Sequence, residues 1–304
     1  AALSAYGRCA VLDAASGSDH TSDWFAAREA ESRFVIYLAD APPARSDWRE
    51  LCLRQADALL LLADAEADPA AAPWHELANG HGDALHRPRH LVLAHRGGAI
   101  RLGAACGWLA RVPAARLHHV RAADDIERVA RLVIGRSLGL VLSGGGARGF
   151  GHIGVVKALR EAGLRIDAVG GTSIGAIIGA GVAADWSTEQ MIDVYRRAFV
   201  DGKPLRDYTL PFVALTRGRR VARLLREAFG AIDIEDLALP FFAVSANLTR
   251  GDVVVHRSGL LWLWLRASSA IPGVLPPVLH RGQVLVDGAV MNNLPTDTMR
   301  AERV

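Results

Sequence analysis

Residues 138–180 read LGLVLSGGGARGFGHIGVVKALREAGLRIDAVGGTSIGAIIGA, and this stretch decides the fold of the second half of the chain. Two short strand-like runs, 138–142 and 167–170, each end in a glycine-rich turn that leads into a helix-like segment. Short apolar runs bounded by glycines are typical of buried parallel strands. The repeated order of strand, turn and helix therefore predicts an α/β unit with a mostly parallel sheet.

The first glycine-rich turn has the register G-x-G-x-x-G at Gly144, Gly146 and Gly149. This register is common in dinucleotide-binding turns, where backbone amides at a helix N-terminus bind a pyrophosphate. The same amides can stabilise the oxyanion of acyl transfer, so the turn alone leaves both interpretations open. A dinucleotide site also expects an acidic residue that closes the second strand, whereas Asp167 opens it.

The second turn reads GTSIG and matches the pattern G-x-S-x-G around Ser173. A serine on a sharp strand-to-helix turn presents its hydroxyl at a helix N-terminus, and Gly171 and Gly175 would relieve crowding there. A packing turn of small residues has a similar composition. The strand before the turn and the small-residue helix after it are the context that a nucleophile requires, so Ser173 is the candidate nucleophile.

A serine nucleophile needs a base to accept its proton. The two histidines after Ser173, His256 and His280, fall inside strand-like segments, and His152 is expected to pack or cap locally. Asp287 stands at a strand end before Gly288 and could take the proton directly, although Asp-Gly is also a common turn dipeptide. The residues favour a Ser–Asp dyad and leave a Ser-His-Asp hydrolase as an alternative.

The motifs at 144–149, 171–175 and Asp287-Gly288-Ala289, in that order, resemble the patatin-like phospholipases. Four further stretches resemble the neuropathy target esterase branch of that family: SSAIPGVLPPV (268–278), VDGAVMNNLPTD (286–297), FVIYLAD (34–40) and WRELCLRQADALLLL (48–62). The resemblance implies a three-layer α/β/α esterase domain with a mostly parallel central sheet over residues 137–304. It also implies a smaller Rossmann-like α/β domain of unknown role over residues 1–136.

By this resemblance Ser173 is the nucleophile and Asp287 the base of a serine esterase. The resemblance places an oxyanion hole in one run of backbone, formed by Gly144, Gly145, Gly146, Ala147, Arg148 and Gly149, with Arg148 helping to hold the loop. The implied substrates are lysophospholipids and related acyl esters, cleaved through an acyl-enzyme with no cofactor and no metal. A nucleotide-binding regulatory protein and a catalytically silent lipid-binding module are the alternatives.

Members of this family carry cyclic-nucleotide-binding-like domains and often a membrane anchor upstream, and their catalytic domain continues past the Asp-Gly motif. A chain that starts at Ala1 and stops at Val304 is therefore expected to be a fragment, truncated at its C-terminal end. The expected location is cytoplasmic, peripheral to the inner face of the membrane.

The first 135 residues also alternate strand-like and helix-like segments, which predicts a further parallel sheet. The strand-like runs are 34–39, 58–63 and 90–95, and the helix-like ones are 47–55, with Ser46 as its N-cap, 74–85 and 124–134. This half contains no phosphate loop or paired carboxylates, and a scaffold or an interface is its expected role.

The remaining patterns belong to the second half. STEQ at 187–190 predicts a capping box that opens a helix to about residue 199, and a further helix is expected over 217–229. Two hairpins are expected, 241–247 with 253–256 and 278–280 with 284–286. The run LLWLWL at 260–265 is open between a core helix and a segment that lies at a bilayer interface or lines an acyl pocket.

Composition excludes several classes of protein. The net charge is only +3, lysine occurs only at Lys157 and Lys203, and no Lys/Arg-rich block indicates nucleic-acid binding. The three cysteines are scattered without metal-ligand spacing. The longest apolar runs fall short of the roughly 20 residues that a membrane span needs, so any membrane contact by this stretch is expected to be peripheral.

Overall fold

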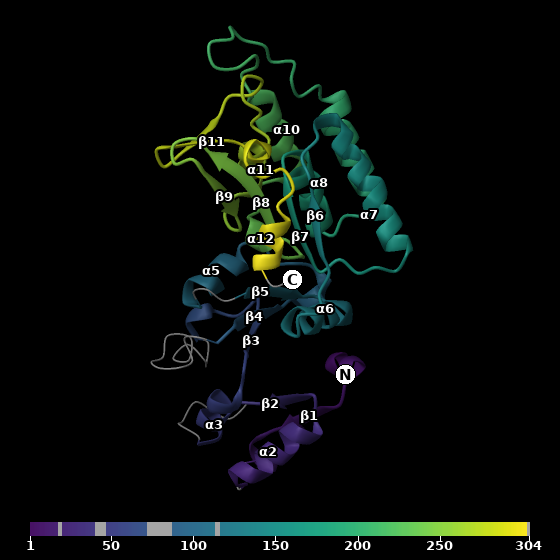
Figure 1. Cartoon of the computed structure of the whole chain (residues 1–304), viewed down its shortest axis with the longest axis vertical. Coiled ribbons are helices and arrows are strands. Elements are labelled where there is room, and N and C mark those ends of the chain that lie inside the picture. The colour runs from purple at the N-terminus through teal and green to yellow at the C-terminus, as the bar shows by residue number, and fades with distance from the viewer. Residues whose placement is uncertain (18–19, 40–46, 72–86, 113–115, 303–304) are drawn as a thin grey trace. The chain divides into compact units, whose positions relative to one another are not determined.

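The computed structural model describes residues 1–17, 20–39, 47–71, 87–112 and 116–302. The chain divides into two compact units, Ala1–Ile134 and Gly135–Val304 (Figure 1). Both units alternate strands and helices, and five of the eight strand pairs in the described residues are parallel. The predicted α/β class with mostly parallel sheets is confirmed.

The strands of the first unit form two parallel sheets. In the smaller one β1 (Cys9–Leu12) pairs with β2 (Phe34–Tyr37). The larger sheet has the order β3-β4-β5 and consists of β3 (Leu59–Asp64), β4 (Arg89–Ala94) and β5 (Arg116–Val120). All three strand-like runs predicted in this half are strands, but the single sheet that we expected is divided in two among the described residues.

The helices of the first unit cover two small cores. They are η1 (Ala2–Tyr6), α1 (Ala14–Gly17), α2 (Ser22–Glu31), α3 (Asp47–Gln55), η2 (Pro69–Ala71), η4 (Arg96–Gly98), α5 (Ala104–Arg111) and α6 (Ala123–Val133). The predicted helices at 47–55 and 124–134 correspond to α3 and α6. The predicted N-cap Ser46 and the predicted helix at 74–85 lie outside the described residues.

The second unit is built on one mixed sheet with the order β10-β11-β8-β7-β6, and β9 pairs with β8 off this path. Its strands are β6 (Gly139–Leu142), β7 (Ala168–Thr172), β8 (Phe241–Asn247), β9 (Asp252–His256), β10 (Val278–His280) and β11 (Gln283–Asp287). β6, β7 and β8 are parallel, and the two predicted hairpins are the antiparallel pairs β8–β9 and β10–β11.

Strand β8 brings two distant parts of the chain together. β9 pairs with residues 243–247 of β8 and so occupies one of its edges. β7 pairs with residues 241–244 and β11 with residues 245–247, so these two strands share the other edge end to end. β7 runs parallel to β8 and β11 antiparallel, and therefore their carboxyl ends meet, with Thr172 opposite Val244 and Asp287 opposite Ser245.

The helices of the second unit position its turns and its core. They are η5 (Gly146–Phe150), α7 (Gly151–Glu161), α8 (Ile174–Ala183), α9 (Thr188–Tyr195), the π-helix η6 (Arg196–Asp201), α10 (Arg219–Phe229), η7 (Ile234–Asp236), α11 (Leu261–Ser268), η8 (Gly288–Val290) and α12 (Thr296–Ala301). The predicted capping box is present: the Ser187 hydroxyl accepts from the Gln190 amide, and the Gln190 side chain accepts from the Ser187 amide.

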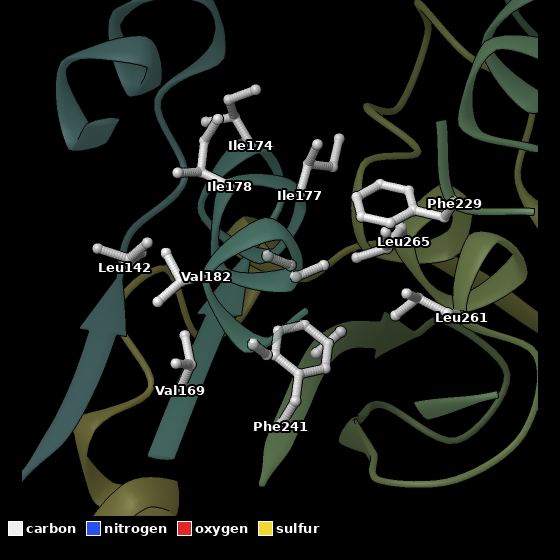
Figure 2. Packing of buried hydrophobic residues seen from close by; sticks show 14 of the residues in the cluster. Leu142, Val169, Ile174, Ile177, Ile178, Val182, Phe229, Phe241, Leu261 and Leu265 are labelled. Atoms are coloured by element: carbon white, nitrogen blue, oxygen red, sulfur yellow. The ribbon is translucent and has the colours of Figure 1, made fainter. Parts of the chain in front are cut away.

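Helix α8 is the centre of the core, and every one of its residues is buried. Figure 2 shows its side chains among those of the sheet and of the helices that follow, with these residues labelled: Leu142, Val169, Ile174, Ile177, Ile178, Val182, Phe229, Phe241, Leu261 and Leu265. The run LLWLWL forms most of α11, and Leu261 and Leu265 are fully buried in this cluster. Of the two interpretations of LLWLWL, the core helix is confirmed.

In the described parts of the chain, none of the helices combines the length and the apolar character that spanning a membrane requires.

Candidate active site

Ser173 stands at the junction of β7 and α8, as the G-x-S-x-G pattern predicts. Its backbone has φ 57° and ψ −127°, a strained conformation for a residue with a side chain. The turn is tight enough that a methyl group at Gly171 would lie 2.7 Å from the Ala176 nitrogen, and one at Gly175 would overlap the Leu142 carbonyl oxygen. Glycine is required at both positions because the turn leaves no room for a Cβ.

The Ser173 hydroxyl donates a hydrogen bond of 2.6 Å to Oδ2 of Asp287, across 114 residues of sequence. The second carboxylate oxygen, Oδ1, accepts from the Ala289 amide at 2.9 Å, which fixes the orientation of the carboxylate. Both side chains are buried, with residue exposures of 5% and 4%. The structure thus brings together the two residues that the sequence singled out.

Burial raises the pKa of Asp287, because the charged carboxylate is removed from water. The hydrogen bonds from Ser173 and from the Ala289 amide stabilise the charged form and act in the opposite direction, but the effect of burial is larger. A carboxylate with a raised pKa is a stronger base, and Asp287 already accepts a hydrogen bond from the serine hydroxyl. This arrangement is able to remove that proton when the serine attacks an electrophile.

Ser268 belongs to the candidate site although no sequence motif marks it. Its hydroxyl accepts a hydrogen bond of 2.9 Å from the Ser173 amide and donates one of 2.6 Å to the Val244 carbonyl. It therefore ties the strained turn to β8, at the residue opposite the end of β7. Ser268 lies within SSAIPGVLPPV, a stretch that signalled the family but gave no reason to single out one serine.

The glycine-rich turn after β6 lies directly against Ser173. A methyl group at Gly144 would be 3.2 Å from the Ser173 Cβ and 2.6 Å from Oδ1 of Asn293. The Gly144 amide donates to the Asn293 carbonyl at 3.2 Å, so this amide is already engaged. The turn continues into η5 at Gly146, and the amides of Gly145 and Gly146 have no backbone acceptor in the described residues.

Two residues of the predicted oxyanion run differ in their surroundings. Gly149 is buried against Ile174, where any side chain would overlap the isoleucine. The Arg148 side chain is exposed, and it makes no hydrogen bond or ion pair to the residues that the structure describes. The suggestion that Arg148 holds the loop therefore finds no polar contact to support it. The contact between Gly144 and Asn293 attaches the loop instead.

The segment after Asp287 is a second part of the site that the motifs did not assign. The Thr172 hydroxyl donates to the Asn292 carbonyl at 2.9 Å, and the Asn292 amide side chain donates to Asp297 at 2.9 Å. With the bond from Gly144 to Asn293, this segment joins the end of β7 to the glycine-rich turn. The contacts to Thr172 and Gly144 are made by the backbone carbonyls of Asn292 and Asn293, which a residue of any type would supply, so sequence patterns do not reveal them.

The histidines take no part in this arrangement. His152 meets the Ser143 carbonyl at 2.9 Å, the local role that was predicted for it. His256 bonds Ser245 at 2.7 Å, and burial lowers its pKa to about 4. His280 packs edge-on against Trp264. Within the described ranges no histidine is hydrogen-bonded to Ser173 or Asp287.

Two further observations bear on cofactors. Asp167, the acidic residue at the distance of a ribose ligand, is fully buried, and its carboxylate accepts from the Leu138 amide at 3.0 Å. A ribose that took this carboxylate would leave the Leu138 amide, just before β6, without its acceptor. No group of three or more His, Cys, Asp or Glu side chains lies close enough to hold a metal ion in the residues that the structure covers.

Comparison with known proteins adds the family. Residues 140–300 match the patatin-like phospholipase family, and residues 5–137 match the P-loop-like domain of the neuropathy target esterase family. A structure of VipD from Legionella pneumophila covers 52% of this chain and 47% of its own at 17% identity, with a TM-score of 0.38.

Curated relatives are more similar in sequence. An uncharacterized NTE family protein of Mycobacterium tuberculosis is 48% identical over 61% of this chain and 32% of its own length. Lysophospholipase NTE1 of Cryptococcus neoformans is 32% identical over 93% of this chain and 21% of its own length. Human patatin-like phospholipase domain-containing protein 6 is 35% identical over 92% of this chain and 22% of its own length.

The chain thus spans between a fifth and a third of the length of these relatives. The family matches cover most of its residues and agree with the resemblance seen in the motifs. This chain belongs to the patatin-like phospholipase family, in the neuropathy target esterase branch.

Proposed function

We propose that the unit Gly135–Val304 is a serine esterase that hydrolyses the carboxylic ester of lysophospholipids or related acyl lipids. The single observation that carries the proposal is the 2.6 Å hydrogen bond from the Ser173 hydroxyl to Asp287, made at a strained turn between a strand and a helix. The names of the family and of the fungal relative support the lipid substrate class.

The first half of the reaction forms an acyl-enzyme. The Ser173 oxygen attacks the ester carbonyl carbon while Asp287 takes the hydroxyl proton. The carbonyl oxygen becomes an oxyanion, and the amides of Gly145, Gly146 and Ala147 at the start of η5 are the donors proposed for it. When the tetrahedral intermediate collapses, Asp287 returns the proton to the departing alcohol, and the acyl group remains on Ser173.

The second half releases the acid. A water molecule gives its proton to Asp287 and attacks the acyl carbon, and a second oxyanion forms against the same amides. Collapse then breaks the bond to Ser173, which recovers its proton from Asp287. Atoms balance over the two halves: one ester and one water give one alcohol and one carboxylic acid.

We further propose that the predicted boundary between residues 136 and 137 separates an accessory domain from the esterase domain. Along the chain, the division between the compact units falls between Ile134 and Gly135. The first family match ends at residue 137 and the second begins at residue 140. All residues of the proposed mechanism fall in the second part, so the accessory domain would contribute no group to the chemistry.

A substrate panel with an active-site label tests the function. The chain should react stoichiometrically with a fluorophosphonate and hydrolyse lysophosphatidylcholine and short aryl esters, and Ser173→Ala should lose both properties. Replacing His152, His256 and His280 one at a time separates this mechanism from a Ser-His-Asp hydrolase, because labelling should survive every histidine change. An unlabelled Ser173 together with a higher melting temperature in the presence of NAD would favour a nucleotide-binding protein and overturn the esterase.

A further inference from the structure

The segment that connects η6 to α10 exposes several large apolar side chains to solvent. We call residues 203–219, which include the first residue of α10, the apolar loop. Its exposed residues include Phe212 at 90%, Leu210 at 72%, Tyr208 at 71% and Val213 at 67%. Isolated exposed apolar residues are ordinary, but a contiguous group of this size marks an interaction surface. Figure 1 shows the segment in green, extending beyond α10.

The apolar loop is ordered at its base, so its tip is held away from the core. The Thr209 amide donates to the Leu215 carbonyl at 3.0 Å, and the Arg217 amide donates to the Asp207 carbonyl at 2.8 Å. Ala214 and Thr216 are buried. The base is thus closed by two backbone hydrogen bonds, and Leu210, Phe212 and Val213 lie beyond it, exposed to solvent.

The base of the loop is attached to the segment that carries the proposed site. The Leu215 amide donates to the Gly273 carbonyl at 2.9 Å, and the Thr216 amide donates to the Val274 carbonyl at 3.1 Å. Three residues before Gly273, the Ala270 carbonyl accepts from the Asp287 amide at 2.9 Å. The loop is therefore connected to the Ser173–Asp287 pair through two short sets of backbone hydrogen bonds.

Positive charge flanks the base of the apolar loop on both sides. Lys203, Arg206, Arg217 and Arg219 are exposed, and none of them forms an ion pair with the acidic side chains in the described ranges. The one acidic residue inside the loop, Asp207, is partly buried, and its carboxylate accepts from the Arg220 amide at 3.0 Å. An apolar tip that projects from a base with unpaired cations is complementary to a surface with anionic headgroups above hydrocarbon.

We propose that the apolar loop docks the esterase unit on the surface of a bilayer that contains anionic phospholipid. Leu210, Phe212 and Val213 enter the boundary between headgroups and acyl chains, while the four cations contact the phosphates. The docking explains how a site built from buried side chains meets an amphiphilic substrate, and in that respect it rests on the proposed function. It differs from the interface considered for LLWLWL, in which Leu261 and Leu265 lie in the core.

Vesicle co-sedimentation tests the surface without any turnover. The parent is Ser173→Ala, mixed with vesicles of phosphatidylcholine alone or of phosphatidylcholine with phosphatidylglycerol. The triple change Leu210→Ser, Phe212→Ser and Val213→Ser should weaken binding roughly tenfold or more, since each buried apolar side chain contributes to partitioning. The matched control is Leu279→Ser on β10, which removes a side chain of 74% exposure from another place and should bind like the parent.

The charge half of the proposal has its own variant. Lys203→Glu with Arg206→Glu should weaken binding to anionic vesicles roughly tenfold and leave the weak binding to phosphatidylcholine alone unchanged. Added salt should reduce binding of the parent and have little effect on this variant. To check that the variants fold, both sets of changes are also made in the chain that retains Ser173. These variants should still hydrolyse a soluble aryl ester.

The outcomes separate this inference from the esterase proposal. Equal sedimentation of the parent and the triple variant, or equal binding to neutral and anionic vesicles, overturns the docking surface, and a loop that contacts only a protein partner would give this result. A chain that binds anionic vesicles through the loop but never reacts with a fluorophosphonate keeps the docking surface and overturns the esterase.

Discussion

The two glycine-rich turns of the second unit follow neighbouring parallel strands and lead into helices, yet they are built in opposite ways. The turn after β7 is closed: it is buried, strained at Ser173, and has no room for a side chain at Gly175. The turn after β6 is open at its centre: Gly145, Gly146 and Ala147 are exposed, and no heavy atom lies within 4 Å of a Cβ added to Gly146. The comparison teaches that one turn fixes a side chain, whereas the other presents backbone amides.

The largest expected effect comes from removing the charge that faces the closed turn. Asp287→Asn should lower kcat/KM on an aryl ester by about 10⁴-fold, because an amide accepts no proton from Ser173. Thermal stability should not fall, since the amide has no charge to desolvate and can still accept from the Ala289 amide. Steady-state kinetics and a melting curve check both halves. If the Asp287→Asn variant retained a tenth of the activity, that result would contradict the proposed role of Asp287 as the base.

The difference in room between the two turns should appear in stability. Gly175→Ala forces a methyl group into the Leu142 carbonyl and should lower the free energy of unfolding by about 3 kcal/mol. Gly145→Ala meets nothing closer than 3.8 Å and should change it by less than about 1 kcal/mol. Urea unfolding followed by circular dichroism gives both values. Similar losses at the two positions would mean that the turns do not differ in the way described.

A smaller effect is expected at the bond that ties down the closed turn. Ser268→Ala removes the acceptor of the Ser173 amide and should lower kcat roughly tenfold, with KM little changed. Ser269→Ala is the matched control, because it is also a buried serine that donates to a backbone carbonyl but does not touch Ser173. Both variants should lose about 1 kcal/mol of stability. A role limited to packing would reduce kcat equally in the two.

The smallest effect is a displacement of the pH profile. Asp287 must be ionised to accept a proton, so activity is present above its pKa and is lost as the pH falls through it. Because burial raises that pKa, kcat/KM should begin to fall at a higher pH than an exposed aspartate would require. The profile should be measured over the range where the protein stays folded. An acid limb at or below the ordinary aspartate pKa would contradict the effect of burial.

The sequence predicted those parts of the molecule that local pattern controls. The strands before both turns, the capping box at Ser187 and the two hairpins follow from short-range periodicity and turn residues. β5, RLHHV, was not predicted because two of its five residues are histidines. Both of these are buried. His118 is hydrogen-bonded to His90 of β4, and His119 is hydrogen-bonded to His95, the residue after β4. Histidines that pair with each other can be buried in a strand, and such a strand lacks the apolar pattern by which strands are predicted.

Hydropathy also failed to separate two apolar segments with opposite fates. LLWLWL is the more hydrophobic, and its leucines at 261 and 265 are fully buried. The segment around Phe212 has no sequence pattern that predicts a surface role, and it is the more exposed of the two. Exposure depends on which elements cover a segment, and that is decided by contacts far along the chain. The same limit hid Ser268 and Asn293, whose partners lie 95 and 149 residues away.

Because β7 and β11 lie end to end on one edge of β8, the contact between Ser173 and Asp287 is expected to form late in folding. Side chains alternate between the two faces of a sheet, so a slip of one residue in the pairing of β11 would turn Asp287 to the opposite face from its partner Ser245. The pairing of Ser173 with Asp287 also closes a loop of more than a hundred residues, a contact that forms slowly. Under the proposed mechanism, a nascent or misregistered chain would hold Ser173 without Asp287 and would be unable to hydrolyse an ester before folding is complete.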